Sequence, residues 1–214
     1  MFKSIQKFLI VAISMMLTGI GASLGIKAAV GVGAWDALSL SVSGVIDMKV
    51  GTFSMIMNIS CVLLQLILLK KEFKINHIVQ IFVAVLLGFV VNFMIYDVYS
   101  KFTIDSYWMN VLLLILSVII CAASISVIMA INLVTFPLES VCMIISKKIN
   151  KNFGFIRQFV DVLSIAIALA VSFLFNESIT VREGTVIAMI LFGPLLNVFM
   201  KLMMPKLKSA RLVE

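Results

Sequence analysis

Two stretches of this chain share one pattern of breaks and polar residues. Residues 134–161 read VTFPLESVCMIISKKINKNFGFIRQFVD, and residues 31–58 read GVGAWDALSLSVSGVIDMKVGTFSMIMN. In each stretch a helix breaker opens a short apolar segment, and a glycine then leads into a longer one. The pattern predicts two copies of one broken-helix unit. A shift of 103 positions aligns their key residues, Asp36 with Glu139, Gly51 with Gly154, Ser54 with Arg157 and Asn58 with Asp161.

The composition indicates that the chain lies in a membrane. Of its 214 residues 63% are hydrophobic and 13% are charged, and the mean hydropathy is +1.21. These values lie outside the range of soluble globular domains. The apolar residues come in blocks of about 20, the length that crosses the hydrocarbon core. We therefore predict one integral membrane domain, residues 1–214, with the lipid bilayer as its surroundings.

Several function classes lack the residues they need. The net charge of +7 comes from lysines in short clusters between apolar blocks, which is typical of cytoplasmic loops, so we expect no nucleic-acid partner. His77 is the only histidine, and the three cysteines have neither a CxxC nor a Cys/His spacing. The chain therefore lacks most of the residues that a zinc hydrolase site or a Ser-His triad requires. We expect no enzyme activity, no metal site and no cofactor, and free cysteines buried as small hydrophobes.

Six apolar blocks are long enough to span a bilayer. They cover residues 8–30, 52–69, 77–96, 107–131, 153–175 and 184–203. We expect Pro205 to end the last block. Residues 34–46 would form a helix of only about 20 Å, so we predict a re-entrant segment there and another opened by Pro137. The predicted fold class is an all-α membrane protein with six transmembrane helices plus two short re-entrant or broken helices.

The basic residues predict the orientation of these spans. With the termini on one side, twelve lysines and arginines, Lys3 and Arg211 among them, fall on that side, four fall on the other, and Arg157 lies within the membrane. Cytoplasmic loops carry the excess of positive charge, so both termini should be cytoplasmic.

Each half of the chain contains an odd number of spans. The first half covers residues 5–97 and the second residues 107–203, with three spans in each. Two copies of a three-span unit in one chain must lie in opposite orientations, and we therefore predict two inverted three-span repeats, the plan of many transporters. Gly88 and Asn92 of the first half also match Gly193 and Asn197 of the second, at an offset of 105.

A polar stripe runs along the longer segment of each copy. Arg157, Asp161, Ser164 and Ala168 share a helix face, as do Ser54, Asn58, Cys61 and Gln65. Asp161 would lie roughly 10 to 12 Å into the membrane, where its short side chain needs a partner or a hydrated cavity. Arg157 is the obvious partner. The pair is either a structural ion pair that locks two helices or part of a substrate or proton path, because ionisable residues inside the membrane are usually functional.

The two short helices begin with matching acidic residues. With Gly33 and Phe136 as N-caps, Asp36 and Glu139 fall at the third helical position, and Pro137 takes the favoured first position. A carboxylate there either caps free N–H groups of its own helix or faces a central site shared by both short helices. Trp35 is either an interfacial anchor or a gate at that site.

The motifs at these positions resemble a bacterial family. The motifs are GVGAWDAL at 31–38, Pro137-Leu138-Glu139, Arg157-x-x-x-Asp161, Gly184-Thr185 and Gly193-Pro194. With them the chain resembles the YczE/YyaS/YitT group of bacterial integral membrane proteins, on its YczE side. The resemblance implies a multispanning fold and a transport role in the bacterial cell membrane. Members often have proline before the Trp-Asp pair and aspartate where Glu139 stands, so Ala34 and Glu139 depart from the pattern.

The sequence therefore predicts a secondary permease for a small polar metabolite in the bacterial cytoplasmic membrane. The substrate site would comprise Trp35, Asp36, Asn58, Glu139, Arg157 and Asp161. Arg157 would meet an anionic group of the substrate, and Asp161 or Glu139 would carry a coupling proton. The alternative is a substrate-binding or scaffold subunit of a larger complex, similar to the substrate-capture (S) component of an ECF vitamin importer. A homodimer is a further expectation.

Overall fold

The computed structural model describes residues 2–209, with the side chains described from residue 5 on. Its eight α-helices are α1 (Phe2–Ala28), α2 (Ala34–Val45), α3 (Val50–Leu69), α4 (Ile75–Asn92), α5 (Tyr107–Ile131), α6 (Pro137–Lys148), α7 (Phe153–Leu174) and α8 (Glu183–Ser209). The helix α4 continues into a π-helical turn, Phe93–Val98. No strand occurs among these residues.

Six of the helices are long and apolar enough to cross a membrane, namely α1, α3, α4, α5, α7 and α8. The remaining two, α2 and α6, have 12 residues each, or about 18 Å, and fall well short of the roughly 30 Å hydrocarbon core. This result confirms the predicted all-α membrane fold with six spans and two short helices. Lys3 and Arg211, which entered the count of basic residues, lie outside the described side chains.

The two halves of the chain form their helices at equivalent positions. At the offset of 103, α2 and α6 begin at Ala34 and Pro137 and have equal length, and α3 and α7 begin at Val50 and Phe153. The backbone repeats at the same offset as well: Ala29 and Asn132, with φ of 54° and 51°, and Asp47 and Asn150, with φ of 50° and 52°, all adopt the left-handed conformation. Residues other than glycine rarely adopt this conformation. Its recurrence therefore shows a shared backbone path, which apolar sequence similarity alone would not.

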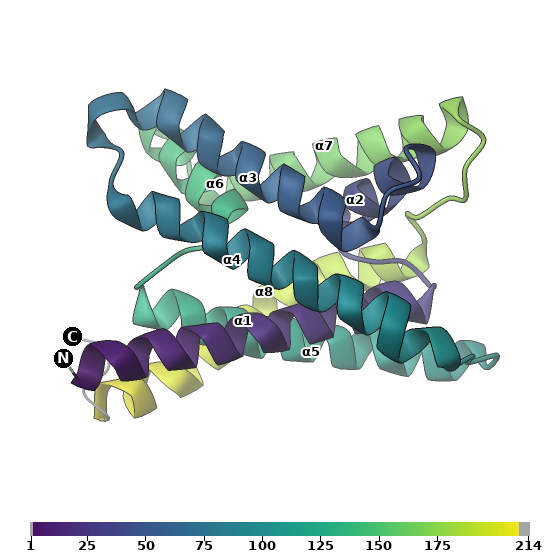
Figure 1. Ribbon diagram of the computed structural model, residues 1–214, viewed down its shortest axis with the longest axis horizontal. Helices are drawn as coiled ribbons and strands as arrows, with labels where there is room; N and C mark the ends of the chain where they lie inside the picture. The colour runs from purple at the N-terminus through teal and green to yellow at the C-terminus, as the bar shows by residue number, and fades with distance from the viewer. Residues whose placement is uncertain (1, 210–214) are drawn as a thin grey trace.

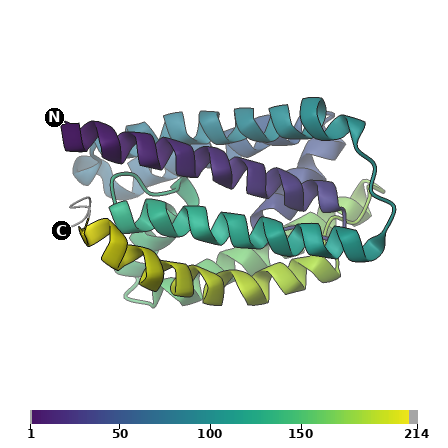
Figure 2. The same cartoon turned by 90° about the horizontal axis from the view of Figure 1, so that it is seen from below.

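The halves run in opposite directions. In Figure 1, α1 runs from left to right and α5, its equivalent, from right to left. The start of α1 and the end of α8 lie at the same end of the molecule, which we call the terminal end (Figures 1 and 2). The short helices α2 and α6 both start near the middle and diverge toward opposite ends.

The helices form two layers, with α1, α4, α5 and α8 in one and α2, α3, α6 and α7 in the other (Figure 1). Most packed pairs have an equivalent in the other half. The contact of α2 with α7 matches that of α6 with α3, α2 with α3 matches α6 with α7, and α1 with α4 matches α5 with α8. One extensive contact has no equivalent in the other half: α3 packs closely on α4, whereas α7 does not pack comparably on α8.

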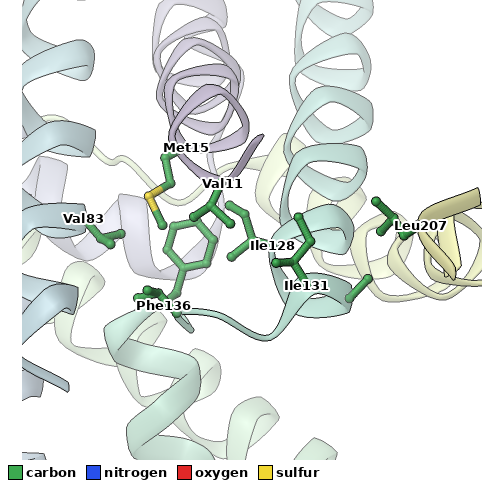
Figure 3. Packing of buried hydrophobic residues seen from close by; sticks show 9 residues of the cluster. Val11, Met15, Val83, Ile128, Ile131, Phe136 and Leu207 are labelled. Atoms are coloured by element: carbon green, nitrogen blue, oxygen red, sulfur yellow. The ribbon is translucent and has the colours of Figure 1, made fainter. Parts of the chain in front are cut away.

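Two apolar clusters lie at opposite ends of the layer that contains α1 and α5. At the terminal end the ring of Phe136 is surrounded by side chains of α1, α4 and α5 (Figure 3), and Val11, Met15 and Ile128 are among the buried members of this cluster. At the opposite end, which we call the far end, Val30 and Leu114 belong to a second cluster. The loops that precede α2 and α6 thus each insert side chains into apolar packing.

At the far end Gly31 lets the loop before α2 lie directly on the start of α8. Its φ is +116°, and a Cβ at this position would lie 2.6 Å from the backbone nitrogen of Thr185. The neighbouring Val30 carbonyl accepts a hydrogen bond of 2.8 Å from the backbone N–H of Gly184. Only glycine tolerates both the backbone conformation and the close approach.

The expected end of the last span at Pro205 is wrong. The helix α8 continues through Pro205 to Ser209, and Leu207 is buried in the terminal-end cluster. An interior proline costs about 3 kcal/mol, and burial of a leucine side chain returns roughly 1.5–3 kcal/mol. Packing in the final turn therefore offsets the break that the sequence indicates.

Candidate functional site

A cavity of about 200 Å³ lies where the two halves meet, and all eight helices contribute to its lining. At roughly 30 Å³ for each water molecule, it has room for about seven waters or a small solute. The six residues predicted as a substrate site all line this cavity: Trp35, Asp36, Asn58, Glu139, Arg157 and Asp161.

The lining follows the repeat. Many of its residues occur as pairs at the offset of 103: Thr18 with Cys121, Ala22 with Ile125, Gly33 with Phe136, Trp35 with Leu138, Asp36 with Glu139, Ser54 with Arg157, and Asn58 with Asp161. Leu87 and Phe192 are paired at the offset of 105. The cavity is therefore built from equivalent surfaces of two oppositely directed units, and chemically different side chains at equivalent positions give it two unlike sides.

The short helices bring the acidic residues to the cavity. Gly33 is the N-cap of α2, and Phe136 is the N-cap of α6 with Pro137 at its first position. Asp36 and Glu139 therefore lie in the first turns, as predicted. Among the described residues, neither carboxylate accepts a hydrogen bond from a backbone N–H. Hydrogen-bonded capping of their own helices therefore does not account for these two acids.

Arg157 connects α7 with α6. Its guanidinium contacts Asp161, one turn further along α7, and its Nε lies 3.6 Å from Oε1 of Glu139 on α6. All three side chains are about one-fifth exposed. The arrangement is an ion-pair network that both holds two helices together and lines the cavity, so the structural and the functional interpretations of Arg157 and Asp161 remain compatible.

On α3, the equivalent positions carry a neutral polar pair. The Asn58 amide donates to the Ser54 carbonyl oxygen at 2.9 Å and lies 3.5 Å from the Ser54 hydroxyl. Asn58 is only 5% exposed, and both donor bonds use its nitrogen. Its Oδ1 accepts no hydrogen bond from the described residues. The side chain thus leaves one acceptor at the cavity lining.

Trp35 is half-buried and lines the cavity. It packs against a buried cluster from α3, α6 and α7 that includes Cys61, Leu138 and Cys142. Its indole N–H is buried and has no acceptor among the described residues. Asp36, next in sequence, forms no ion pair within 4.0 Å among the described side chains, in contrast to Glu139 and Asp161.

The outer positions of the polar stripes support the short helices and do not line the cavity. Gln65 is fully buried and donates to Gln80 Oε1 at 2.8 Å and to the Pro137 carbonyl oxygen at 3.1 Å. The Ser140 hydroxyl donates to Gln65 Oε1 at 3.0 Å. These bonds fix the start of α6 and hence the position of Glu139. At the equivalent position of α7, Ala168 packs in the cluster that contains Ala37 of α2.

Sequence reasoning missed the residues that α1 and α5 contribute. Thr18, Ser117 and Cys121 line the cavity, although none of them was among the six predicted site residues. Thr18 and Cys121 are themselves separated by 103 positions. Application of the offset to the first and fourth spans, beyond the broken helices, would have identified both.

Comparison with known proteins assigns a family. A family model described as "Family of unknown function (DUF6198)" matches residues 5–201. The chain belongs to the DUF6198 family. All cavity-lining residues of this DUF6198 chain lie within the matched range. No curated protein and no solved structure matches the chain.

Proposed function

We propose that this chain is a secondary permease that moves a small polar solute across the bacterial cytoplasmic membrane, with both termini in the cytoplasm. The observation that carries the proposal is the cavity between two oppositely directed halves, lined by Asp36, Glu139, Arg157 and Asp161. Discontinuous helices that start at a central site, within an inverted repeat, are the plan of many secondary transporters. A relation to the YczE/YyaS/YitT group, inferred from five motifs of which three contribute residues to this cavity, is in line with that role.

The cost of ionisable groups in a membrane supports a role beyond packing. A charged side chain at the bilayer centre costs about 2.5–3.5 kcal/mol by insertion measurements, and this cavity gathers four such groups. An ion pair that only holds two helices together needs one acid and one base. Here Arg157 has two acidic partners, and Asp36 has no basic partner among the described residues. The surplus acids are suited to bind a solute or to carry a coupling proton, and Glu139 and Asp161 are our candidates for the proton.

Transport in vesicles tests the proposal. The full chain, purified and reconstituted with a defined pH gradient, is assayed for uptake and efflux across a panel of small metabolites. We expect at least one solute to be transported, and we expect Asp161→Asn and Arg157→Ala to reduce its rate by about tenfold or more, as for loss of a charge-assisted contact. Wild-type rates in both variants would contradict the assigned site.

A matched control separates site effects from general damage. Asp47→Asn changes an exposed acid in the turn that follows α2, at a left-handed position that asparagine also tolerates. We expect this variant to transport at the wild-type rate. Purification in mild detergent tests the partners, because a stoichiometric second protein would favour the subunit alternative, and a mass of two chains would support the expected homodimer.

A further inference from the structure

The cavity carries an excess of negative charge. Its lining contains three carboxylates and one guanidinium, a formal charge of −2 with all four groups ionised. Each helix start adds roughly half a positive charge, and α2 and α6 both begin at the cavity. The sum remains near −1, so the positive helix ends do not cancel the surplus.

The surplus is located at Asp36. Arg157 already has Glu139 and Asp161 as partners, and Asp36 has no ion-pair partner among the described residues. The charged groups that face Asp36 are Glu139 on α6 and Arg157 and Asp161 on α7, since the lining parts of α1, α3, α4, α5 and α8 are uncharged. Arg157 is therefore not free to receive an anionic solute, contrary to the role we expected for it from the sequence.

The uncharged lining of the same cavity suits a donor of hydrogen bonds. Asn58 Oδ1 is an unoccupied acceptor in a side chain that is 5% exposed, and Trp35 and Phe192 add aromatic surface. An ammonium or guanidinium group combines a positive charge with N–H donors and is attracted to aromatic rings. Both polar acceptors and the aromatic surface therefore fit one class of ligand.

We propose that the solute of this cavity is an organic cation with N–H groups, a primary amine or a guanidine, bound by the Asp36 carboxylate and Asn58 Oδ1. The inference rests on the proposed permease function and specifies its substrate class. A cation that binds Asp36 offsets the surplus negative charge of the cavity.

Binding to the purified full chain tests this substrate class. Thermal unfolding is followed with millimolar guanidinium, methylammonium, tetramethylammonium or acetate at matched ionic strength. We expect saturable stabilisation by guanidinium or methylammonium, with tetramethylammonium about tenfold weaker because it has no N–H donor. Asp36→Asn should lose this response and Asp36→Glu should retain it, and Asp47→Asn should behave as wild type.

The outcomes separate this inference from the permease proposal. Saturable stabilisation by acetate alone, absence of stabilisation by every cation, or an unchanged response in a folded Asp36→Asn variant would overturn the inference. Cation binding without transport in vesicles would contradict the permease and leave the cation site standing. Transport restricted to anions would contradict the cation site and leave the permease proposal standing.

A second, independent observation concerns the one extensive helix contact that the repeat does not share. On α3 and α4, Gly51 and Gly88 lie in close contact, and a Cβ on either would collide with the backbone of the other. The Gly51 N–H donates to Asn92 Oδ1 at 2.9 Å, and Asn92 Nδ2 donates to the Thr52 hydroxyl at 2.9 Å. We call this contact the Gly51 latch.

The second half carries the equivalent residues without the contact. Gly154, Gly193 and Asn197 correspond to Gly51, Gly88 and Asn92, but a Cβ at Gly193 would meet no atom within 4 Å. Asn197 is exposed in a membrane span, and its side chain forms no hydrogen bond among the described residues. The Gly154 N–H is instead bound by Asn152 Oδ1 at 2.8 Å. An amide that faces lipid without a partner is costly.

We infer a second conformation in which α7 packs on α8 through Gly154, Gly193 and Asn197 while the Gly51 latch opens. In it Asn197 replaces Asn152 as the acceptor for the Gly154 N–H. The two contacts lie toward opposite ends of the molecule, because α3 and α7 run in opposite directions and each contact involves the start of its helix (Figure 1). Their exchange would move access to the cavity from one membrane face to the other, the motion that the proposed permease requires.

Paired cysteines test the exchange in a background in which Cys61, Cys121 and Cys142 are replaced. Thr52→Cys with Asn92→Cys reports the observed state, because these side chains are in contact here, and Phe155→Cys with Asn197→Cys reports the second. We expect both pairs to cross-link in membranes under mild oxidation, and a formed 52–92 cross-link to suppress cross-linking at 155–197. A 155–197 pair that does not cross-link where 52–92 does would overturn the inference, whatever the solute. Single-cysteine variants detect links between chains.

Discussion

Thr18 and Cys121 contact each other although they occupy equivalent positions of the two halves: the Cys121 thiol donates to the Thr18 carbonyl oxygen at 3.7 Å. A residue that touches its own equivalent must lie close to the axis that relates the two copies. Both residues line the cavity. The cavity therefore lies at the axis itself, where each half presents the same positions from the opposite direction.

Removal of Arg157 alone should destabilise the protein more than removal of Arg157 together with the charge of Asp161. Arg157→Ala leaves Glu139 and Asp161 facing each other without a cation, and we expect a loss of about 2–3 kcal/mol in folding stability, reduced from the value of a fully buried pair because the side chains are partly exposed. Arg157→Ala with Asp161→Asn should recover at least half of it. Thermal unfolding in detergent provides the measurement, with the exposed Lys71→Ala as control. A double variant no more stable than the single one would contradict the prediction.

Substitution of Gly31 should destabilise the loop before α2, whereas the same change at Gly193 should not. Gly31→Ala combines a φ of +116° with a collision against the Thr185 backbone, for which we expect a cost of about 2–3 kcal/mol. Gly193→Ala meets no atom of another segment, and the helix preference of alanine is opposed by the ring of the following Pro194, so the change should be within about 1 kcal/mol. Melting temperatures of the two variants check the contrast, and equal effects would refute it.

Loss of Gln65 should loosen α6. Gln65→Leu leaves polar groups of Gln80, Pro137 and Ser140 without their partner inside the molecule, and each unsatisfied buried group costs about 1–3 kcal/mol. We expect a fall in melting temperature and faster hydrogen exchange in α6. Ser60→Ala removes an exposed hydroxyl from α3, the helix that carries Gln65. It should change neither the melting temperature nor the hydrogen exchange in α6. If Gln65→Leu lowers the melting temperature but leaves hydrogen exchange in α6 unchanged, the hydrogen bonds of Gln65 do not hold α6, and the prediction is wrong.

Thiol labelling should distinguish the three free cysteines. Cys121 lines the cavity, whereas Cys61 and Cys142 are buried in a cluster between helices. We expect a small methanethiosulfonate reagent to modify Cys121 first. A reagent with an ammonium group should react about tenfold faster there than one with a sulfonate, because negative potential concentrates cations. Mass spectrometry of peptides gives the site and rate, and free cysteine gives the intrinsic ratio of the reagents. A faster sulfonate would contradict the negative cavity.

Much of the fold could be predicted because its signals are local. The start of α2 after Gly33, the start of α6 at Pro137 and the full extent of α5 follow from breakers and apolar length alone. The four ionisable residues among the six predicted site residues line one cavity because a charged group in a membrane span avoids the lipid. Thr18 and Phe192 carry no such signal, since small and apolar residues are common on every span.

Other features depend on packing between distant segments. The Gly-x-x-x-Asn motif occurs in α4 and in α8, yet only the Gly88 copy is packed against its partner helix. The motif is the same in both copies, so its sequence does not determine which one is closed. By its residue type alone, Trp35 fits an interfacial anchor as well as a gate, and its place at the cavity depends on its packing against α3, α6 and α7.

The antiparallel course of α1 and α5 has a consequence for the origin of the chain. A protein of half this length, with one copy of the unit, would form the same central chamber only as two subunits inserted into the membrane upside down relative to each other. Fusion of two such genes into one fixes a single orientation for each copy. Only then is each copy free to diverge, so that one presents Arg157 and Asp161 where the other keeps Ser54 and Asn58.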